Sequence, residues 1–483
     1  MISLVLISGA LLASADSCQP VARGDGSALL QTAARHIGLA SARGKVLRQR
    51  GFDVIQHTFE SDRTYPPSLA EVKRFDAWFD PATGAERQDT RSTIGGFEFG
   101  SSTLGSATAS YGVRDTTLVP SKALHSDAYA TRPLNVWAML DDWLAAPDVR
   151  VEAQCSYRDY PRIVLGRNGA RGREQLYLDP KSGYPVKLDR VEPHYLWGQV
   201  HVEFVYSTWQ RFGEAHLPAG SFRIEDGTTM VTRTFGERRL VAHDSAPSLV
   251  LPAREHSMGF APAAFLAPGK PDTIRVSPTV YLLKNRGYTE AIALVHDSVF
   301  VFDATQGEER VQQDSAWIAT VFPGRHPIVV VVTDLAWPHV AGVRSWVARG
   351  ATIVAHRAAR DFLSQVVNRR WTLSHDLLER RRAKSQFRFR PVSDTLSLGG
   401  GDILVFPIDG VASEIALAAF VRPSGFLWAS DYVQNLTAPT QYVDEVVAAA
   451  ARSGVTPELV AAQHIPLTRW DRVVPLADPA ARP

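Results

Sequence analysis

The pattern of hydrophobic and polar positions changes twice along the chain. Residues 27–40 have helical spacing, with Leu30, Ala33 and Ile37 on one side and Gly38 near the end. From about residue 45 to residue 252, apolar and polar positions alternate in short runs instead. The first pattern predicts one amphipathic helix, and the second predicts an antiparallel sheet with one face in water.

The alternating region contains a clear strand and a clear turn. Residues 199–206 place Val200, Val202 and Phe204 on one face, while polar side chains occupy the positions between them. Residues 178–185 combine a turn-forming Asp, a Gly that tolerates positive φ and a Pro that blocks a strand. We therefore expect hairpins in this region, and nothing in it resembles a catalytic cluster.

After a segment rich in Pro, Ala and Gly at residues 256–272, strands and helices alternate. The strands are expected at residues 279–283, 291–295, 298–302, 328–332, 351–355, 403–406 and 426–430, and the helices at residues 339–349, 358–367 and 442–452. Such an order is typical of sheets enclosed between helices. We predict an α/β protein with two domains, at residues 19–255 and 273–483, joined by a linker at residues 256–272.

Length and charge add little to this prediction of the fold, whereas the amino-terminal residues and the cysteines bear on where the protein is located. The chain has 483 residues, enough for two cores, and 52 basic residues nearly balance 50 acidic ones. Residues 1–15 carry a short apolar run followed by a small-x-small pattern, which predicts a signal peptide and an exported protein, periplasmic or secreted. Cys18 and Cys155 are the only cysteines; in an oxidising compartment they could pair, but the sequence does not show that they meet.

Two stretches resemble known families. The run VVVVTDLAWPHVAGVRSWVARGATIVAH, residues 329–356, resembles the segment of metallo-β-lactamase-superfamily hydrolases that carries a Thr-His-x-His-x-Asp-His-x-Gly-Gly motif between a buried strand and a helix. Thr333, Gly342 and the following strand all match, and the resemblance implies an αββα sandwich for the second domain. The stretches LDPKSGYPVKL and YSTWQRFGEAHLPAGSFRI resemble the half-barrel sheet plus helix of periplasmic lipoprotein-carrier proteins. This second resemblance implies a half-barrel-like first domain that could capture an apolar ligand.

The metal-binding motif of the family is degenerate in this chain. At the motif positions Asp334 and Ala336 replace two histidines, Pro338 replaces the aspartate, and only His339 remains. The next histidine of the family would fall within residues 410–414, where no histidine occurs and Ser413 is the nearest polar candidate. Proline supplies neither charge nor a backbone donor, so the family's two-metal mechanism is not expected here.

Two later positions match the family. The resemblance places a metal-bridging aspartate at Asp431 and a final histidine at His464. His339, Asp431 and His464, with Asp334 as a further carboxylate, form a set that suits one zinc or iron ion with open positions for water and substrate. The alternative for each residue is structural, because His339 can begin a helix, His464 can bond the backbone, and Asp431 can anchor a loop.

Two functions follow from these residues. The first is an exported hydrolase-like protein with an atypical, single-metal site that acts on a small-molecule substrate. The second is a non-catalytic pseudoenzyme of the same fold, with no metal, that binds an apolar ligand or a partner. The arginine-rich residues 369–390 are expected to form a solvated connector rather than a nucleic-acid surface, and no segment has transmembrane length.

Overall fold

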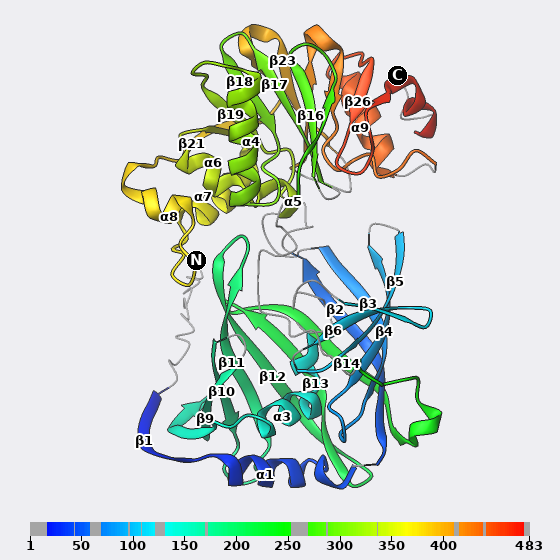
Figure 1. Cartoon of the computed structure of the whole chain (residues 1–483), viewed down its shortest axis with the longest axis vertical. Coiled ribbons are helices and arrows are strands. Elements are labelled where there is room, and N and C mark those ends of the chain that lie inside the picture. The colour runs from blue at the N-terminus through cyan, green and yellow to red at the C-terminus, as the bar shows by residue number, and fades with distance from the viewer. Residues whose placement is uncertain are drawn as a thin grey trace, which may run out of the picture.

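The computed structural model describes residues 17–42, 44–57, 69–94, 97–107, 109–120, 131–169, 172–252, 269–285, 288–335, 337–409, 415–437 and 441–477. The expected signal peptide and residues 256–268 of the expected linker lie outside these ranges. We call residues 17–252 the N-terminal unit and residues 269–477 the C-terminal unit. Figure 1 shows the first unit in blue to green below and the second in green to red above.

One large sheet of fourteen strands makes up most of the N-terminal unit, with the order β1-β8-β9-β10-β11-β12-β13-β14-β2-β3-β4-β5-β6-β7. Its strands are β1 (Ser17–Asp25), β2 (Val46–His57), β3 (Leu69–Phe79), β4 (Glu86–Ile94), β5 (Phe97–Gly105), β6 (Ser110–Arg114), β7 (Thr117–Pro120), β8 (Arg150–Tyr157), β9 (Tyr160–Gly169), β10 (Gly172–Leu178), β11 (Pro185–His194), β12 (Gly198–Phe212), β13 (Ala215–Glu225) and β14 (Thr228–Val241).

The alternation predicted for residues 199–206 is confirmed in β12. Val200, Val202 and Phe204 are buried, and the intervening His201 is exposed. The turn predicted at residues 178–185 is also present, where the Asp179 carboxylate accepts hydrogen bonds from the backbone N–H groups of two following residues at 3.0 and 2.8 Å. Local sequence chemistry therefore sets the hairpins of this sheet.

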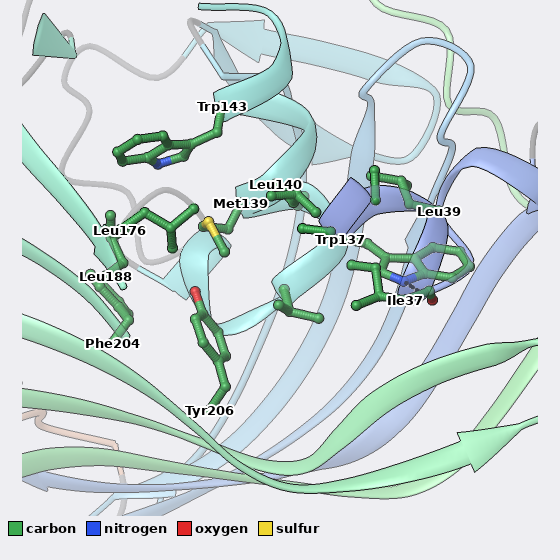
Figure 2. Close-up of a cluster of buried hydrophobic side chains, with 14 of the residues drawn as sticks. Ile37, Leu39, Trp137, Met139, Leu140, Trp143, Leu176, Leu188, Phe204 and Tyr206 are labelled. Atoms are coloured by element: carbon green, nitrogen blue, oxygen red, sulfur yellow. Dashed lines mark hydrogen bonds between the residues drawn. The ribbon is translucent and has the colours of Figure 1, made fainter. Parts of the chain in front are cut away.

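Two helices, α1 (Ser27–His36) and α3 (Val136–Leu144), cover the concave face of the large sheet. Figure 2 shows the side chains of α3 pointing toward those of the sheet, with Trp143 and Met139 near Leu176, Leu188 and Phe204. Tyr206 donates its hydroxyl to the carbonyl of Pro133 at 2.7 Å, which fixes the entry to α3. The predicted helix at residues 27–40 ends at His36, and α3 was not predicted.

Paired charges lie buried on the same large sheet. Arg233 on β14 faces Asp53 on the neighbouring β2, and two hydrogen bonds of 2.8 Å join the guanidinium to the carboxylate. Arg190 on β11 lies 3.1 Å from Glu174 on β10. Both pairs are nearly inaccessible to solvent. The interior of this unit thus contains both an apolar core beside the helices and buried ion pairs.

A disulfide joins Cys18 on β1 to Cys155 on β8, which are directly opposite each other in the antiparallel register of these strands. The pairing that the sequence left open is therefore present in this structure. It ties the first described strand to the edge of the large sheet, across a sequence separation of 137 residues.

Two sheets form the C-terminal unit. The first sandwich sheet has seven strands in the order β15 to β21: β15 (Asp272–Arg275), β16 (Val280–Asn285), β17 (Tyr288–Val295), β18 (Ser298–Phe302), β19 (Ile328–Val331), β20 (Thr352–His356) and β21 (Arg388–Val392). The second sandwich sheet has six: β22 (Leu396–Leu398), β23 (Ile403–Pro407), β24 (Leu417–Val421), β25 (Phe426–Trp428), β26 (Leu459–Ala461) and β27 (Thr468–Arg469). In the first sheet β18, β19, β20 and β21 run parallel to one another, and in the second sheet β25 runs parallel to β26.

The α-helices of the C-terminal unit are α4 (Glu308–Val321), α5 (Trp337–Val340), α6 (Val343–Ala348), α7 (Arg360–Asn368), α8 (Leu377–Arg381) and α9 (Gln441–Arg452). Short 3₁₀ turns across the whole chain are η1 (Ala40–Ala42), η2 (Arg132–Leu134), η3 (His243–Ser245), η4 (Arg357–Ala359), η5 (Arg382–Lys384), η6 (Gly399–Gly401), η7 (Arg422–Ser424), η8 (Trp470–Arg472) and η9 (Val474–Leu476). The helix predicted at residues 339–349 is divided into α5 and α6, and α4 was not predicted. No helix within the described ranges is long and apolar enough to cross a bilayer.

Three hydrophobic clusters arrange these elements in four layers. Along β18, Val299 and Val301 pack in a cluster with α4, α6 and α7, whereas Phe300 and Phe302 pack against the second sandwich sheet. The third cluster joins the other face of the second sheet to α9. The order is helices, sheet, sheet and helix, which explains why strands such as β18 and β19 are apolar on both faces.

The turn between β11 and β12 reaches from the N-terminal unit into the C-terminal one. Leu196, at its tip, is 2% exposed and belongs to the cluster between the first sandwich sheet and its helices. Beside it, Trp197 packs edge to face on Phe362 of α7, with ring centres 5.6 Å apart. We call residues 195–198 the docking turn, because they connect the cores of the two units.

The basic residues 369–390 hold this docking turn. Trp371 lies against Gly198, where an added Cβ would come within 2.3 Å of the indole ring, and the positive φ of Gly198 also favours glycine. Arg369 pairs with Asp226 at 2.6 Å. Part of the stretch is therefore a contact surface within the chain, which differs from the solvated connector that composition predicted.

Candidate metal site

Three polar residues lie within two positions of the ends of buried strands, at one edge of the sandwich. Asp303 follows β18, Thr333 follows β19 and Ser430 follows β25. Because β18 and β19 are parallel neighbours, the residues that follow them meet at the same edge. The Thr333 hydroxyl bonds the carboxylate of Asp303 at 2.6 Å and the hydroxyl of Ser430 at 2.9 Å, so the two sheets are joined at this point.

The buried carboxylate of Asp303 accepts hydrogen bonds from several residues at this edge. Its Oδ1 accepts from the backbone N–H and the hydroxyl of Thr333, at 2.9 and 2.6 Å, and its Oδ2 accepts from Nε1 of Trp428 at 2.9 Å. Nδ1 of His339 lies 2.8 Å from the same Oδ2. Asp303 has a φ of 76°, an unusual value for a residue other than Gly, which the surrounding bonds stabilise.

The loop that carries His339 is fixed by the backbone next to Asp303. The N–H of Ala304 bonds the carbonyl of His339 at 2.8 Å, and the N–H of Gly342 bonds the carbonyl of Ala304 at 2.7 Å. A Cβ on Gly342 would lie 2.7 Å from a methyl group of Val311. Gly342, which matched the family motif, is therefore required by close packing.

His339 is fully buried and has one ring nitrogen engaged and one not. Its Nε2 has no hydrogen-bond partner among the described residues. Burial alone would lower the pKa of His339, but the negative charge and hydrogen bond of Asp303, together with the charges of Asp334 and Asp431, raise it to about 9. The Asp303 carboxylate therefore favours the protonated imidazole, and a metal ion at Nε2 would displace the proton from that nitrogen.

Asp431 and His464 come together because they follow parallel neighbouring strands, β25 and β26. Nε2 of His464 lies 3.1 Å from Oδ1 of Asp431, an ion-pair contact without the angles of a hydrogen bond. Both side chains are partly exposed, at 42% and 28%. Adjacent ligands of a tetrahedral zinc ion lie roughly 3.4 Å apart, so this spacing suits two ligands of one ion.

Two of the four predicted metal ligands are thus in contact with each other. Asp431 and His464 face each other, while His339 is paired with Asp303; Asp334 is buried and adds negative potential at His339. Across the described ranges no group of three or more His, Cys, Asp or Glu side chains is close enough to hold a metal ion. The chemistry of the donors fits a metal, but three of them do not converge in this structure.

Several predicted positions cannot be placed. Ala336 and residues 410–414, including Ser413, lie outside the described residues, and nothing is described of the Pro338 side chain. The sequence patterns did not identify Asp303, Thr333 and Ser430 as site residues. A polar residue directly after an apolar run was the available signal, since Asp431 shows the same pattern.

Comparison with known proteins gives a likeness in structure alone. No family model and no curated protein matches the sequence. The solved DIM-1 metallo-β-lactamase is 14% identical, with 43% of this chain and 96% of that one covered, at a TM-score of 0.35. A metallo-β-lactamase from Erythrobacter litoralis with β-mercaptoethanol in its active site is 12% identical, with 42% and 93% covered, at a TM-score of 0.34. One from Pontibacter korlensis is 14% identical, with 42% and 95% covered, also at 0.34. The four layers of the C-terminal unit, described above from its own packing, agree with the αββα sandwich that the sequence resemblance implied.

Proposed function

We propose that this chain is an exported, metallo-β-lactamase-like hydrolase with a single-metal site at the edge defined by Asp303. His339, Asp431 and His464 would hold the ion, with Asp334 as a further carboxylate. The observation that carries this proposal is the state of His339, whose Nδ1 is held by Asp303 while its buried Nε2 has no partner. A carboxylate on one ring nitrogen is the usual support of a histidine that ligates metal through the other.

The chain's own residues would prepare the site for hydrolysis. Asp303 orients the His339 ring, and the bond from Trp428 to Asp303 keeps that carboxylate from turning away. Asp431 and His464 lie at the more exposed side, so an ion that they held would be accessible to a substrate. A metal bound there would lower the pKa of bound water and polarise a carbonyl or phosphoryl group of a small-molecule substrate.

The disulfide supports the exported location, because such bonds persist in oxidising compartments. Expression with the native amino end in a bacterial host tests this part. We expect the mature protein outside the cytoplasm, with a mass that lacks residues 1–15. Recovery of the full-length chain from the cytoplasm, with both thiols free, would contradict export.

Metal analysis tests the site. After growth with zinc, iron and manganese supplied, we expect about one equivalent of one metal in the purified protein and its loss in His339→Asn and His464→Ala. The matched control is His296→Ala, because His296 is exposed and pairs with Asp402 instead. Less than about a tenth of an equivalent in the unmodified protein would reject the metal site.

Hydrolysis separates the enzyme from the pseudoenzyme. A panel of amide, thioester, lactone and phosphodiester substrates should reveal one activity that His464→Ala abolishes and His296→Ala retains. A metal-loaded protein that hydrolyses none of these would favour the non-catalytic alternative.

A further inference from the structure

A pocket of about 240 Å³ lies on the outer face of the first sandwich sheet, between α4 and α6. Ile328, the first residue of β19, contributes to its wall. The candidate metal site lies after the other end of β19, at Thr333. The pocket is therefore separate from the proposed hydrolytic site.

Two arginines give the rim of the pocket positive charge. Arg325 and Arg349 both line it, and neither has a carboxylate within ion-pair distance among the residues that the structure describes. No Asp or Glu is among the lining residues. Burial, followed by the nearby charge of Arg381, lowers the pKa of Arg349, and the charge of Glu308 opposes this shift. An anion in the pocket would relieve the repulsion between the arginines.

The wall of the pocket is apolar and includes a tryptophan. Trp346 is 1% exposed, and its buried Nε1 has no hydrogen-bond acceptor among the described residues. Ile318 and Phe322, both nearly buried, line the same space. Buried donors in folded proteins are almost always satisfied, so an unsatisfied donor on a residue of the pocket wall is consistent with a ligand that carries an acceptor atom.

We propose that this pocket binds a small organic anion, a carboxylate attached to a flat apolar body. The carboxylate would take the two guanidinium groups of Arg325 and Arg349, and the body would lie against Phe322 and Trp346. Arginine suits this role because its planar fork bonds carboxylates at two points. The volume is smaller than that of drug-sized sites, which limits the ligand to one or two rings.

Titration calorimetry with 2-naphthoate tests the proposal on the full chain. We expect saturable binding that weakens at least tenfold in Arg325→Gln with Arg349→Gln, because two charge-assisted contacts are lost. Trp346→Phe keeps a ring and removes only the N–H donor, so it should weaken binding by a smaller factor. Arg275→Gln, an exposed arginine that does not line the pocket, is the matched control and should bind normally.

Two ligand controls identify the chemistry. 2-Naphthalenemethanol has the same body without the charge, and inorganic phosphate has charge without the body; both should bind at least tenfold more weakly. Absence of saturable 2-naphthoate binding at millimolar concentration would overturn the proposal. Equal affinity in the folded double-arginine variant, or equal affinity for either control ligand, would also overturn it.

Discussion

The two units bury polar groups in different ways. In the N-terminal unit, Arg233 and Asp53 satisfy each other through two bonds, and neither is left with an open direction toward a ligand. In the C-terminal unit, Asp303 gathers donors from three elements, yet the His339 it holds keeps one buried nitrogen unpartnered. An ion pair whose two members satisfy each other serves the packing of the sheet. A hydrogen-bond network at strand ends that leaves one buried nitrogen unpartnered indicates a binding site.

The largest effect should come from Asp303→Ala. This change leaves the Trp428 indole N–H, the Thr333 hydroxyl and the His339 ring without their acceptor, and we expect a loss of about 5 kcal/mol in the free energy of unfolding. Denaturant unfolding followed by tryptophan fluorescence measures it. If the alanine variant does not fold, Asp303→Asn provides the measurement, with a smaller loss expected. A change below about 1 kcal/mol in both would contradict the central role of this carboxylate.

Arg233→Met should cost about 3–5 kcal/mol, because it leaves the Asp53 carboxylate buried and unpaired. The double variant Arg233→Met with Asp53→Leu should recover most of that loss, since an apolar pair can replace a closed ion pair. The same unfolding assay gives both values. If the double variant does not regain the lost free energy of unfolding, the Arg233–Asp53 pair has a role beyond packing. Its difference from Asp303 would then be refuted.

Leu196→Ala should cost about 2–3 kcal/mol, because it opens a cavity in the C-terminal core from a residue of the N-terminal unit. Unfolding should also become less cooperative between the units, which two probes, near-ultraviolet and far-ultraviolet circular dichroism, would reveal. The matched control is Leu373→Ala, since Leu373 is 53% exposed and its truncation should have little effect. Similar losses for the two variants would mean that the docking turn does not join the cores.

Glu379→Gln should have the smallest effect, about 1–2 kcal/mol at neutral pH. Burial alone would raise the pKa of Glu379, but hydrogen bonds from Arg382, the backbone of Trp371 and Arg370 lower it to about 2. A lowered pKa in the folded state gives stability that is present above the ordinary value of 4.5 and is lost as pH falls toward 2.

The difference between Glu379→Gln and the unmodified protein should therefore shrink across that window, from pH 4.5 to pH 2. Denaturant midpoints at several pH values measure it, with Glu214→Gln, an exposed residue in the turn between β12 and β13, as control. A difference that stays constant down to pH 2 would show that the ionised carboxylate is not the cause.

Sequence patterns predicted alternating strands and continuous apolar strands, and they missed two helices whose buried residues hide the helical period. The alternation at β12 was clear because its outward residues are polar. In α3, Val136 to Leu140 are all buried, so the helix has no polar stripe to reveal its period. In α4 the buried face includes Arg310 and Asp314, and charged core positions hide the amphipathic signal.

The candidate site was predicted in part for a similar reason. Asp431 and His464 were found because they stand at matching places after strands, and the parallel pairing of β25 and β26 brings them together. The bond between His339 and Asp303 joins residues 36 positions apart, and it exists only once the strands and the motif loop are packed. No local pattern encodes a contact of that kind.

The docking turn is made before the residues that it contacts in the C-terminal unit. The side chain of Gln199, next to the turn, bonds the carbonyl of Arg370, which leaves the ribosome 171 residues later. Until then Leu196 and Trp197 lack their partners and present an apolar tip to the surroundings. Exposed apolar side chains of this kind favour aggregation of an incomplete chain, so the N-terminal unit is fully protected only after the second unit has been made.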